Sequence, residues 1–188
     1  MKQSEIIKQL SDEELKKQLF LSQGILLFIA ALLSIVFFEN VSDWLLYVNW
    51  GIQEIFYFGV IPGLFIVFLD ILLMKVFPKK MYDDGGINRR IFENQSIGFI
   101  FILAFFVAVS EELLFRGVLQ TSFGYFAASL IFALVHFRYL SKPLLFISIV
   151  AVSFFIGYLF EWTGNLLVTI SAHFTVDFLL GLIIRFKS

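Results

Sequence analysis

The strongest constraint on the fold of this chain is a series of long apolar stretches separated by short polar segments. The first stretch covers residues 19–38, close to the roughly 20 residues that a helix needs to cross the hydrocarbon core of a bilayer. Five further stretches follow, at residues 55–77, 95–121, 124–139, 143–160 and 165–186. The sequence therefore predicts an all-α fold, a polytopic membrane helix bundle with about six transmembrane helices.

The composition excludes several other classes of protein. The chain is 60% hydrophobic and 15% charged, whereas a soluble domain carries about 25% charged residues. A soluble domain of 188 residues could not bury so much apolar surface in one core. The net charge of -1 provides no basic surface for nucleic acid, and the absence of cysteine excludes disulfides and a thiol nucleophile.

The N-terminal residues 1–18 are polar and mixed in charge, and we interpret them as a cytoplasmic lead-in. Ser11 and Glu14 have the spacing of a capping box, which predicts the start of a helix. A short amphipathic helix is expected here, with its apolar face formed by Ile6, Ile7, Leu10 and Leu15. The stretch 19–38 lacks a small-residue cleavage site, so we expect it to be retained as a membrane helix. Residues 19–188 are then a single transmembrane domain.

The distribution of basic residues predicts the orientation of this domain. With a cytoplasmic N-terminus, all of the 14 lysine and arginine residues except Arg116 fall in cytoplasmic segments, as the positive-inside rule requires. The three tryptophans, Trp44, Trp50 and Trp162, fall in the outer connectors. Both termini are therefore expected to be cytoplasmic. The segment 78–94 is expected to be a cytoplasmic loop around an Asp-Asp-Gly-Gly turn.

Three charged residues interrupt the third apolar stretch. Glu111, Glu112 and Arg116 lie in the sequence SEELLFRG, at residues 110–117. On a helix, Glu112 and Arg116 stand at i and i+4 and can form an ion pair. Glu111 points in a different direction, because a helix turns by about 100° per residue. One carboxylate can therefore be held by Arg116 while its neighbour remains free to transfer a proton.

Other polar residues lie at a similar depth in the later stretches. Counting a rise of about 1.5 Å per residue from the outer ends of the stretches, the depths are roughly 15 Å for Glu111, 18 Å for His136, 12 Å for His173 and 18 Å for Asp177. Ionisable residues inside a membrane are costly and usually line a cavity or a functional path. We therefore expect these four side chains to meet near the midplane. The same calculation places Asp70 roughly 22 Å deep. We interpret Asp70 as a hydrogen-bonding partner within the second stretch that does not join the other four residues.

A carboxylate beside an imidazole in a dry cavity can bind and deprotonate a water molecule. We predict that Glu111 and His136 activate water, and that His173 and Asp177 stabilise an oxyanion. Glu112 and Arg116 would provide structural support for Glu111. The alternative is a purely structural role, in which Glu112 and Arg116 hold helices together and His136 forms a hydrogen bond between helices. Phe132 is expected to be a packing residue, and Gly117, Gly157 and Gly181 are expected to allow close helix contacts.

Three motifs together resemble a known family. The pattern EExxxR at 111–116, FxxxH at 132–136 and HxxxD at 173–177 is similar to the signature of the CAAX prenyl protease and bacteriocin-processing family of intramembrane proteases, also called the Abi family. The resemblance covers a core of about residues 95–185. It implies an all-helical membrane core and an endopeptidase with a glutamate-activated water.

The resemblance also implies roles for single residues. The catalytic glutamate of the family falls on Glu111, its water-holding histidine on His136, and its oxyanion pair on His173 and the residue four positions later. That residue is Asp177, where the prenyl proteases have Asn. Because a charged Asp would repel an oxyanion, Asp177 is either protonated or serves to orient His173.

The sequence leaves the cofactor open. Both metal-dependent and metal-free mechanisms have been considered for the family, and the zinc-protease motif HExxH is absent here. We favour the metal-free mechanism, which requires no cofactor. If a divalent metal such as zinc is bound, its ligands are expected to be Glu111, His136 and His173.

The leading hypothesis is an intramembrane endopeptidase that cleaves a peptide or a membrane-anchored protein in a bacterial cell membrane. The first alternative is a non-enzymatic membrane interaction or bacteriocin-immunity protein that retains the polar cluster for helix packing. A coupled transporter is a third reading, but the chain is short and has no paired broken helices. A Glu111→Gln substitution separates the endopeptidase from the non-enzymatic protein, because it would leave the function of a non-enzymatic protein unchanged.

Overall fold

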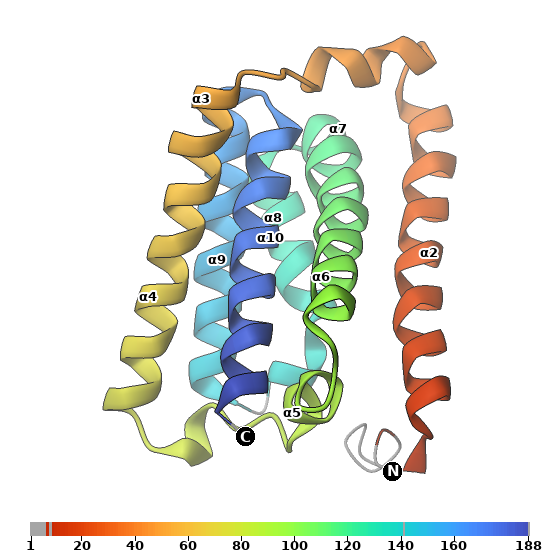
Figure 1. Cartoon of the computed structure of the whole chain (residues 1–188). Coiled ribbons are helices and arrows are strands. Elements are labelled where there is room, and N and C mark those ends of the chain that lie inside the picture. Colours follow the sequence, from red (N-terminus) through yellow and green to blue (C-terminus); the bar gives the residue numbers. More distant parts are fainter. Residues whose placement is uncertain (1–6, 8, 141, 188) are drawn as a thin grey trace.

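The computed structural model describes residue 7, residues 9–140 and residues 142–187, and it contains only helices and connecting segments in that part of the chain (Figure 1). Five helices are long and apolar enough to cross a membrane. They are α2 (Asp12–Phe37), the helix Ile52–Val76, the helix Ile97–Phe123, α9 (Pro143–Thr163) and α10 (Leu166–Phe186). Together with the shorter apolar helix α8 (Tyr125–Val135), they confirm the predicted all-α membrane bundle.

Two of the long helices are composite. The helix Ile52–Val76 consists of α3 (Ile52–Ile55), a π-helical segment η2 (Phe56–Val60) and α4 (Ile61–Val76). The helix Ile97–Phe123 consists of α6 (Ile97–Glu112), a π-helical segment η4 (Leu113–Gln120) and α7 (Thr121–Phe123). π-Helical turns are rare and are often found at functional sites. The second one follows immediately after the Glu111–Glu112 pair.

The elements that connect the long helices are short. They are the 3-10 helices η1 (Val41–Tyr47), η3 (Lys79–Met81) and η5 (Phe137–Tyr139), and the helix α5 (Ile87–Phe92). The prediction of a loop over 78–94 is therefore wrong in part, because η3 and α5 lie within it. The Asp83–Gly86 turn is present as predicted, and the Asp84 carboxylate accepts hydrogen bonds from the first backbone N–H groups of α5.

The N-terminal prediction is corrected in a similar way. The capping box of Ser11 and Glu14 is confirmed. However, the helix that it starts runs without a break to Phe37, so part of the lead-in and the first membrane span are one helix. The expected amphipathic face included Ile6, which lies outside the described residues. The predicted span 124–139 is also too long, because α8 ends at Val135 and His136 has non-helical dihedral angles.

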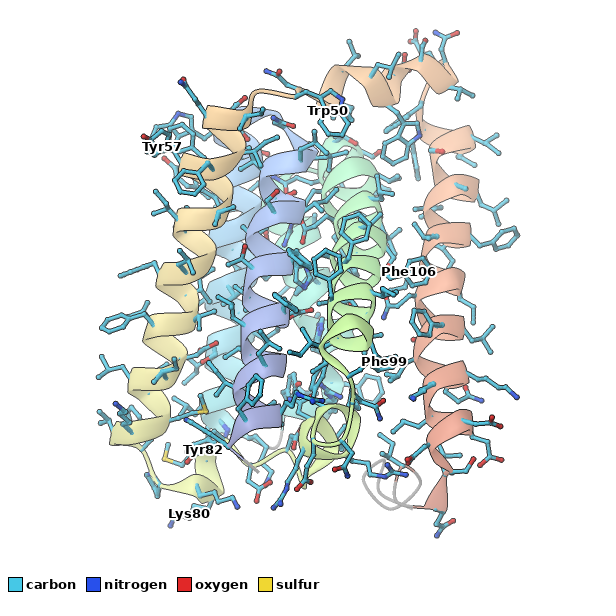
Figure 2. All side chains as sticks on the ribbon, in the orientation of Figure 1. Trp50, Tyr57, Lys80, Tyr82, Phe99 and Phe106 are labelled. Atoms are coloured by element: carbon cyan, nitrogen blue, oxygen red, sulfur yellow. The ribbon has the colours of Figure 1, made fainter. Side chains whose placement is uncertain are left out.

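Helices α4, α10, α6 and α2 stand side by side in the front of Figure 1, and α9 and α8 lie behind them. Helix α10 is central and packs against α6, α4 and α9, whereas α2 packs on α6 and η4. Helix α2 begins and α10 ends at the same end of the bundle, which we call the lower end after Figure 1. Figure 2 shows Trp50 and Tyr57 at the upper end and Lys80 and Tyr82 at the lower end. Phe99 and Phe106 point from α6 toward α2 (Figure 2), where both contact Phe20.

Glycines allow the helices to approach closely, as predicted for three of them. A Cβ atom on Gly117 would lie 2.5 Å from the Trp44 ring, and one on Gly157 would lie 2.6 Å from Ser129 Oγ. A Cβ atom on Gly181 would lie 2.8 Å from Ile100. Because no such contact is tolerated in a close-packed interior, these positions require glycine. The close contacts hold α6, α8, α9 and α10 around the polar residues described next.

Candidate active site

The core of the site is a buried arginine that joins three helices. Arg116 and Glu112 are both 0% exposed, and Arg116 Nε donates to Glu112 Oε2 at 3.3 Å. Arg116 Nη2 donates to the carbonyl oxygen of Ser153 on α9 at 3.1 Å, and Nη1 donates to Ser129 Oγ on α8 at 3.5 Å. Arg116 therefore ties η4 to α8 and α9. A buried charge pair is tolerated only when its hydrogen-bonding groups are satisfied in this way.

Glu112 has a second partner that the sequence did not reveal. Its Oε1 atom accepts a hydrogen bond from His173 Nδ1 at 2.9 Å. Because the carboxylate is paired with Arg116 and can only accept, the hydrogen of His173 lies on Nδ1. The opposite ring atom, His173 Nε2, is then available on the other side of the ring. Glu112 is predicted to support Glu111, and in the structure it also holds the His173 ring through this hydrogen bond.

Two further carboxylates face His173 Nε2. Asp177 Oδ2 lies 3.5 Å from it, and Glu111 Oε2 lies 3.9 Å from it. Glu111 makes no hydrogen bond with the described residues and is not paired with Arg116. The predicted asymmetry between the two glutamates is therefore present in the geometry: Glu112 is held at both oxygens, whereas Glu111 has only the longer contact with His173.

His136 lies directly after the last residue of α8. Its Nδ1 atom donates to the carbonyl oxygen of Phe132 at 2.8 Å, since a carbonyl can only accept. His136 Nε2 therefore has a lone pair available for another group. The Phe132 ring lies between the two histidines, with its centroid 4.8 Å from that of His136 and 6.0 Å from that of His173. No hydrogen bond or ion pair among the described residues joins His136 to Glu111.

One cavity of about 1720 Å³ connects these groups. Its wall includes all four residues predicted to be catalytic, Glu111, His136, His173 and Asp177. Asp70 lines it as well, although the sequence analysis placed this residue outside the group and gave it a hydrogen-bonding role. That role is wrong for the described part of the chain, where no partner of Asp70 is found. Hydropathy gives the depth of a residue in a span but not the side of the helix on which it lies, and Asp70 lies on the cavity side.

The cavity extends to the lower end of the bundle. Its rim there carries both signs of charge, from Lys75, Asp84, Arg89 and Lys187. The Arg89 guanidinium donates to the Glu93 carboxylate at 2.8 and 2.6 Å. These hydrogen bonds hold the pKa of the Glu93 carboxyl below its usual range, so Glu93 compensates the charge of Arg89. The rim is therefore electrostatically mixed.

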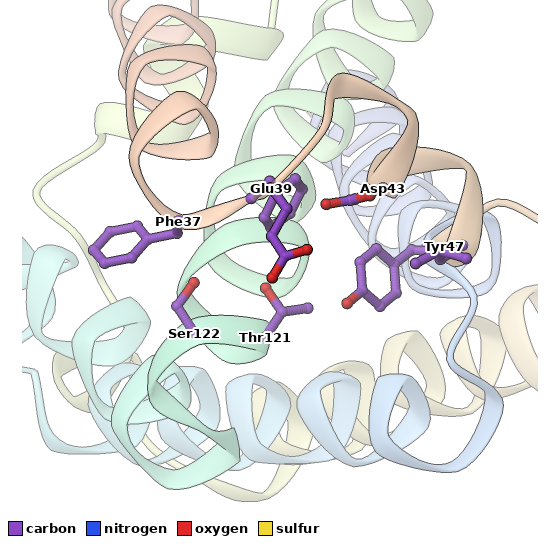
Figure 3. Close-up of a pocket in the computed structure, with 8 residues that line it drawn as sticks. Phe37, Glu39, Asp43, Tyr47, Thr121 and Ser122 are labelled. Carbon is purple, nitrogen blue, oxygen red and sulfur yellow. The ribbon is translucent and has the colours of Figure 1, made fainter.

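A second, smaller hollow of about 310 Å³ lies where η1 meets α7 (Figure 3). Its wall includes Glu39, Asp43, Tyr47, Thr121 and Ser122. None of the predicted site residues lines it. The candidate active site is therefore the large cavity.

The described residues do not form a metal site in this arrangement. No three histidine, aspartate or glutamate side chains among residues 7, 9–140 and 142–187 converge closely enough to hold a metal ion. Zinc requires nitrogen and oxygen ligands at about 2.0–2.2 Å around a common point. Glu111, His136 and His173 share the cavity, but they do not surround a common point in this way. We therefore derive no catalytic step through a metal.

Two residues near the site were missed by the sequence analysis. Ser110 Oγ donates to Gln23 Oε1 at 2.5 Å, which fixes α2 beside the residue that precedes Glu111. The Tyr139 ring stacks on that of His136, with a centroid distance of 6.2 Å and an interplanar angle of 11°. Gln23 could have been noticed, because it is polar within the first apolar stretch. Tyr139 gives no such signal.

Comparisons with known proteins converge on the same region. The family described as type II CAAX prenyl endopeptidase Rce1-like matches residues 93–179, which include Glu111, His136, His173 and Asp177. The chain is 47% identical over 169 residues to a protein of Bacillus subtilis (strain 168) named "Uncharacterized protein YpbD". This alignment covers 89% of the chain and 88% of the Bacillus protein. No solved structure matches the chain.

Proposed function

This chain belongs to the Rce1-like family of type II CAAX prenyl endopeptidases, and from that membership and the geometry of the cavity we propose that it is an intramembrane endopeptidase. The family is a protease family, so the chain is an integral membrane hydrolase. We propose further that it acts in a bacterial cell membrane, where its substrate is a peptide or a membrane-anchored protein. Its mechanism, in this proposal, is attack by a glutamate-activated water.

The state of Glu111 is the single observation that carries this proposal. Its carboxylate is almost fully enclosed, at 9% exposure, yet no arginine neutralises it and no described residue donates a hydrogen bond to it. The nearest charged partner of Glu111 is His173, whose Nε2 atom lies 3.9 Å from Oε2. A carboxylate inside a membrane without a closer partner is costly and is retained where it has a function. A group that can accept a proton from water is the base that peptide hydrolysis requires.

The proposed reaction uses Glu111 and His136 on the same water molecule. The lone pair on His136 Nε2 accepts one hydrogen bond from this water, and Glu111 removes the other proton. The water oxygen forms a bond to the carbonyl carbon of the scissile peptide, whose oxygen becomes an oxyanion. Glu111 then passes the proton to the peptide nitrogen, so that the C–N bond breaks and an amine and a carboxylic acid are released.

His173 stabilises the oxyanion in this mechanism. Three carboxylates lie within 4 Å of its ring nitrogens: Glu112 at Nδ1, and Asp177 and Glu111 at Nε2. In this proposal the ring carries hydrogens on both nitrogens, and Nε2–H donates to the oxyanion. The distance of 3.5 Å from Asp177 to His173 Nε2 supports a role for Asp177 in orienting His173, rather than in contacting the oxyanion.

The competing interpretation as a packing element explains only part of the cluster. It accounts for Arg116, which joins three helices, and for Glu112, which is held at both oxygens. It gives no reason for Glu111, which holds no helix in place. We therefore favour catalysis over helix packing as the reason for the Glu111–Glu112 pair.

Metal removal is expected to leave the activity unchanged. The proposed reaction takes its base from Glu111 and its oxyanion donor from His173, so it contains no step that a metal performs. Purified protein treated with 1,10-phenanthroline and with EDTA should cleave a peptide at the untreated rate. A loss of activity that zinc restores would contradict the glutamate-type mechanism while leaving the assignment as a protease intact.

The proposed function is tested by comparing membrane peptides from cells that produce the wild-type protein or the Glu111→Ala variant. At equal protein levels, we expect cleavage products that occur only with the wild type, together with accumulation of their uncut precursor. Identical peptide profiles at equal expression would support the non-enzymatic alternative.

A further inference from the structure

Asp70 on α4 is a charged residue of the cavity that the proposed mechanism does not use. It lies within an apolar helix and is partly buried. Its carboxylate has no hydrogen bond and no ion pair with any described residue, although it lines the cavity. Water and protein offer it little compensation at this depth, and such residues in membrane proteins usually face a ligand path.

Part of the cavity wall near Asp70 is apolar. Ile71 packs against a hydrophobic cluster that also contacts Val152 of α9 and Leu180 of α10, and all three residues line the cavity. Two lysines of the cavity wall, Lys75 and Lys187, belong to its rim at the lower end, and neither forms an ion pair with Asp70. The described part of the chain therefore supplies no cation to this carboxylate, and a bound molecule could.

The register of α4 against α10 places Asp70 relative to the catalytic groups. The two helices run in the same direction (Figure 1), and Ile66 and Val67 pack against Val176. The same offset puts Asp70 beside Leu180, seven residues past His173. With a rise of about 1.5 Å per residue, Asp70 lies roughly 10 Å from His173 along the helix axis, toward the lower end.

We propose that Asp70 forms a subsite that binds a lysine or arginine side chain of the peptide substrate. An extended peptide advances by about 3.3 Å per residue, so the bound side chain lies about three residues from the scissile bond. Two opposite charges attract each other more strongly in a cavity enclosed by protein than in bulk water. This inference rests on the proposed function and adds a substrate preference to it.

The experiment uses apolar decapeptides that carry a single lysine, norleucine or glutamate at successive positions. Wild-type protein is expected to cleave the best lysine peptide at least about ten-fold more efficiently, in kcat/KM, than the norleucine peptide. In Asp70→Asn the ratio of kcat/KM for the lysine peptide to that for the norleucine peptide should fall to about one, and the norleucine peptide should still be cleaved. In Asp70→Lys the glutamate peptide should become the preferred substrate. Glu13→Gln also removes one negative charge, but at an exposed site outside the cavity, and should keep the wild-type preference.

Further outcomes separate the subsite from the proposed function. An unchanged lysine preference in Asp70→Asn, or no preference in the wild type, would overturn the subsite. Binding of the same peptides to Glu111→Gln protein is measured in parallel and needs no hydrolysis. The peptides could bind with a lysine preference that Asp70→Asn abolishes, while the wild type cleaves none of them. This result would contradict the proposed function and support the subsite. If Lys75→Met abolished the lysine preference as fully as Asp70→Asn does, we would conclude that Asp70 interacts with Lys75 rather than with the substrate.

Discussion

Replacing Glu111 by Ala is expected to lower kcat for peptide cleavage by at least about 1,000-fold, because the reaction loses its general base. KM should change little, since Glu111 acts on water and not on the substrate. Glu111→Gln keeps the size of the side chain and should be equally inactive, because an amide cannot accept the proton. Steady-state kinetics on purified protein in detergent measure both variants.

Stability provides the control for this result. Glu111 is not part of the Arg116 hydrogen-bond network, so both variants are expected to unfold near the wild-type temperature. Glu13→Gln removes an exposed carboxylate outside the cavity and should retain full activity. Full activity of Glu111→Gln would contradict the proposed mechanism.

Replacing Arg116 by Ala is expected to destabilise the protein by about 3–5 kcal/mol, the usual cost of breaking one side of a buried ion pair. The change leaves the Glu112 carboxylate without its cation at a position with 0% exposure. It also removes the hydrogen bonds to Ser129 and Ser153 that join η4 to α8 and α9. Unfolding of the purified protein, followed by circular dichroism, measures the difference.

A double variant separates the structural role of this pair from its role at the site. Arg116→Leu combined with Glu112→Leu removes both charges, so it should recover part of the stability lost in Arg116→Leu alone. Activity should not recover, because His173 Nδ1 loses the acceptor that orients the ring. A stable double variant with wild-type kcat would show that Glu112 is not needed to position His173.

The sequence predicted the long apolar helices, and the four residues that it placed at a similar depth line one cavity. Apolar length identifies membrane helices regardless of their partners, and the Glu112–Arg116 ion pair follows from the i,i+4 spacing within one helix. The end of α8 at Val135 was not predictable in this way. Residues 137–140 are Phe, Arg, Tyr and Leu, so the apolar character of the stretch continues past the point where the helix ends.

The contacts between helices were predicted less well, for a physical reason. The hydrogen bond from His173 to Glu112 depends on how α10 is rotated relative to α6, and hydropathy does not report this rotation. The π-helical segment η4 adds to the difficulty, because its wider turns change the direction of every side chain that follows. Asp70 was misassigned for the same reason, since its depth was estimated but the face on which it lies was not.

The central claim is that Glu111, His136 and His173 border one water-accessible cavity inside the membrane. Because the chain contains no cysteine, the single substitutions Glu111→Cys, His136→Cys and His173→Cys each introduce a unique thiol. In lipid nanodiscs, all three are expected to react rapidly with a charged methanethiosulfonate reagent, which reacts with thiolates in water. Phe101→Cys, on the exposed apolar face of α6, should react slowly because lipid surrounds it. Reaction of the three site cysteines as slow as that of Phe101→Cys would contradict the account.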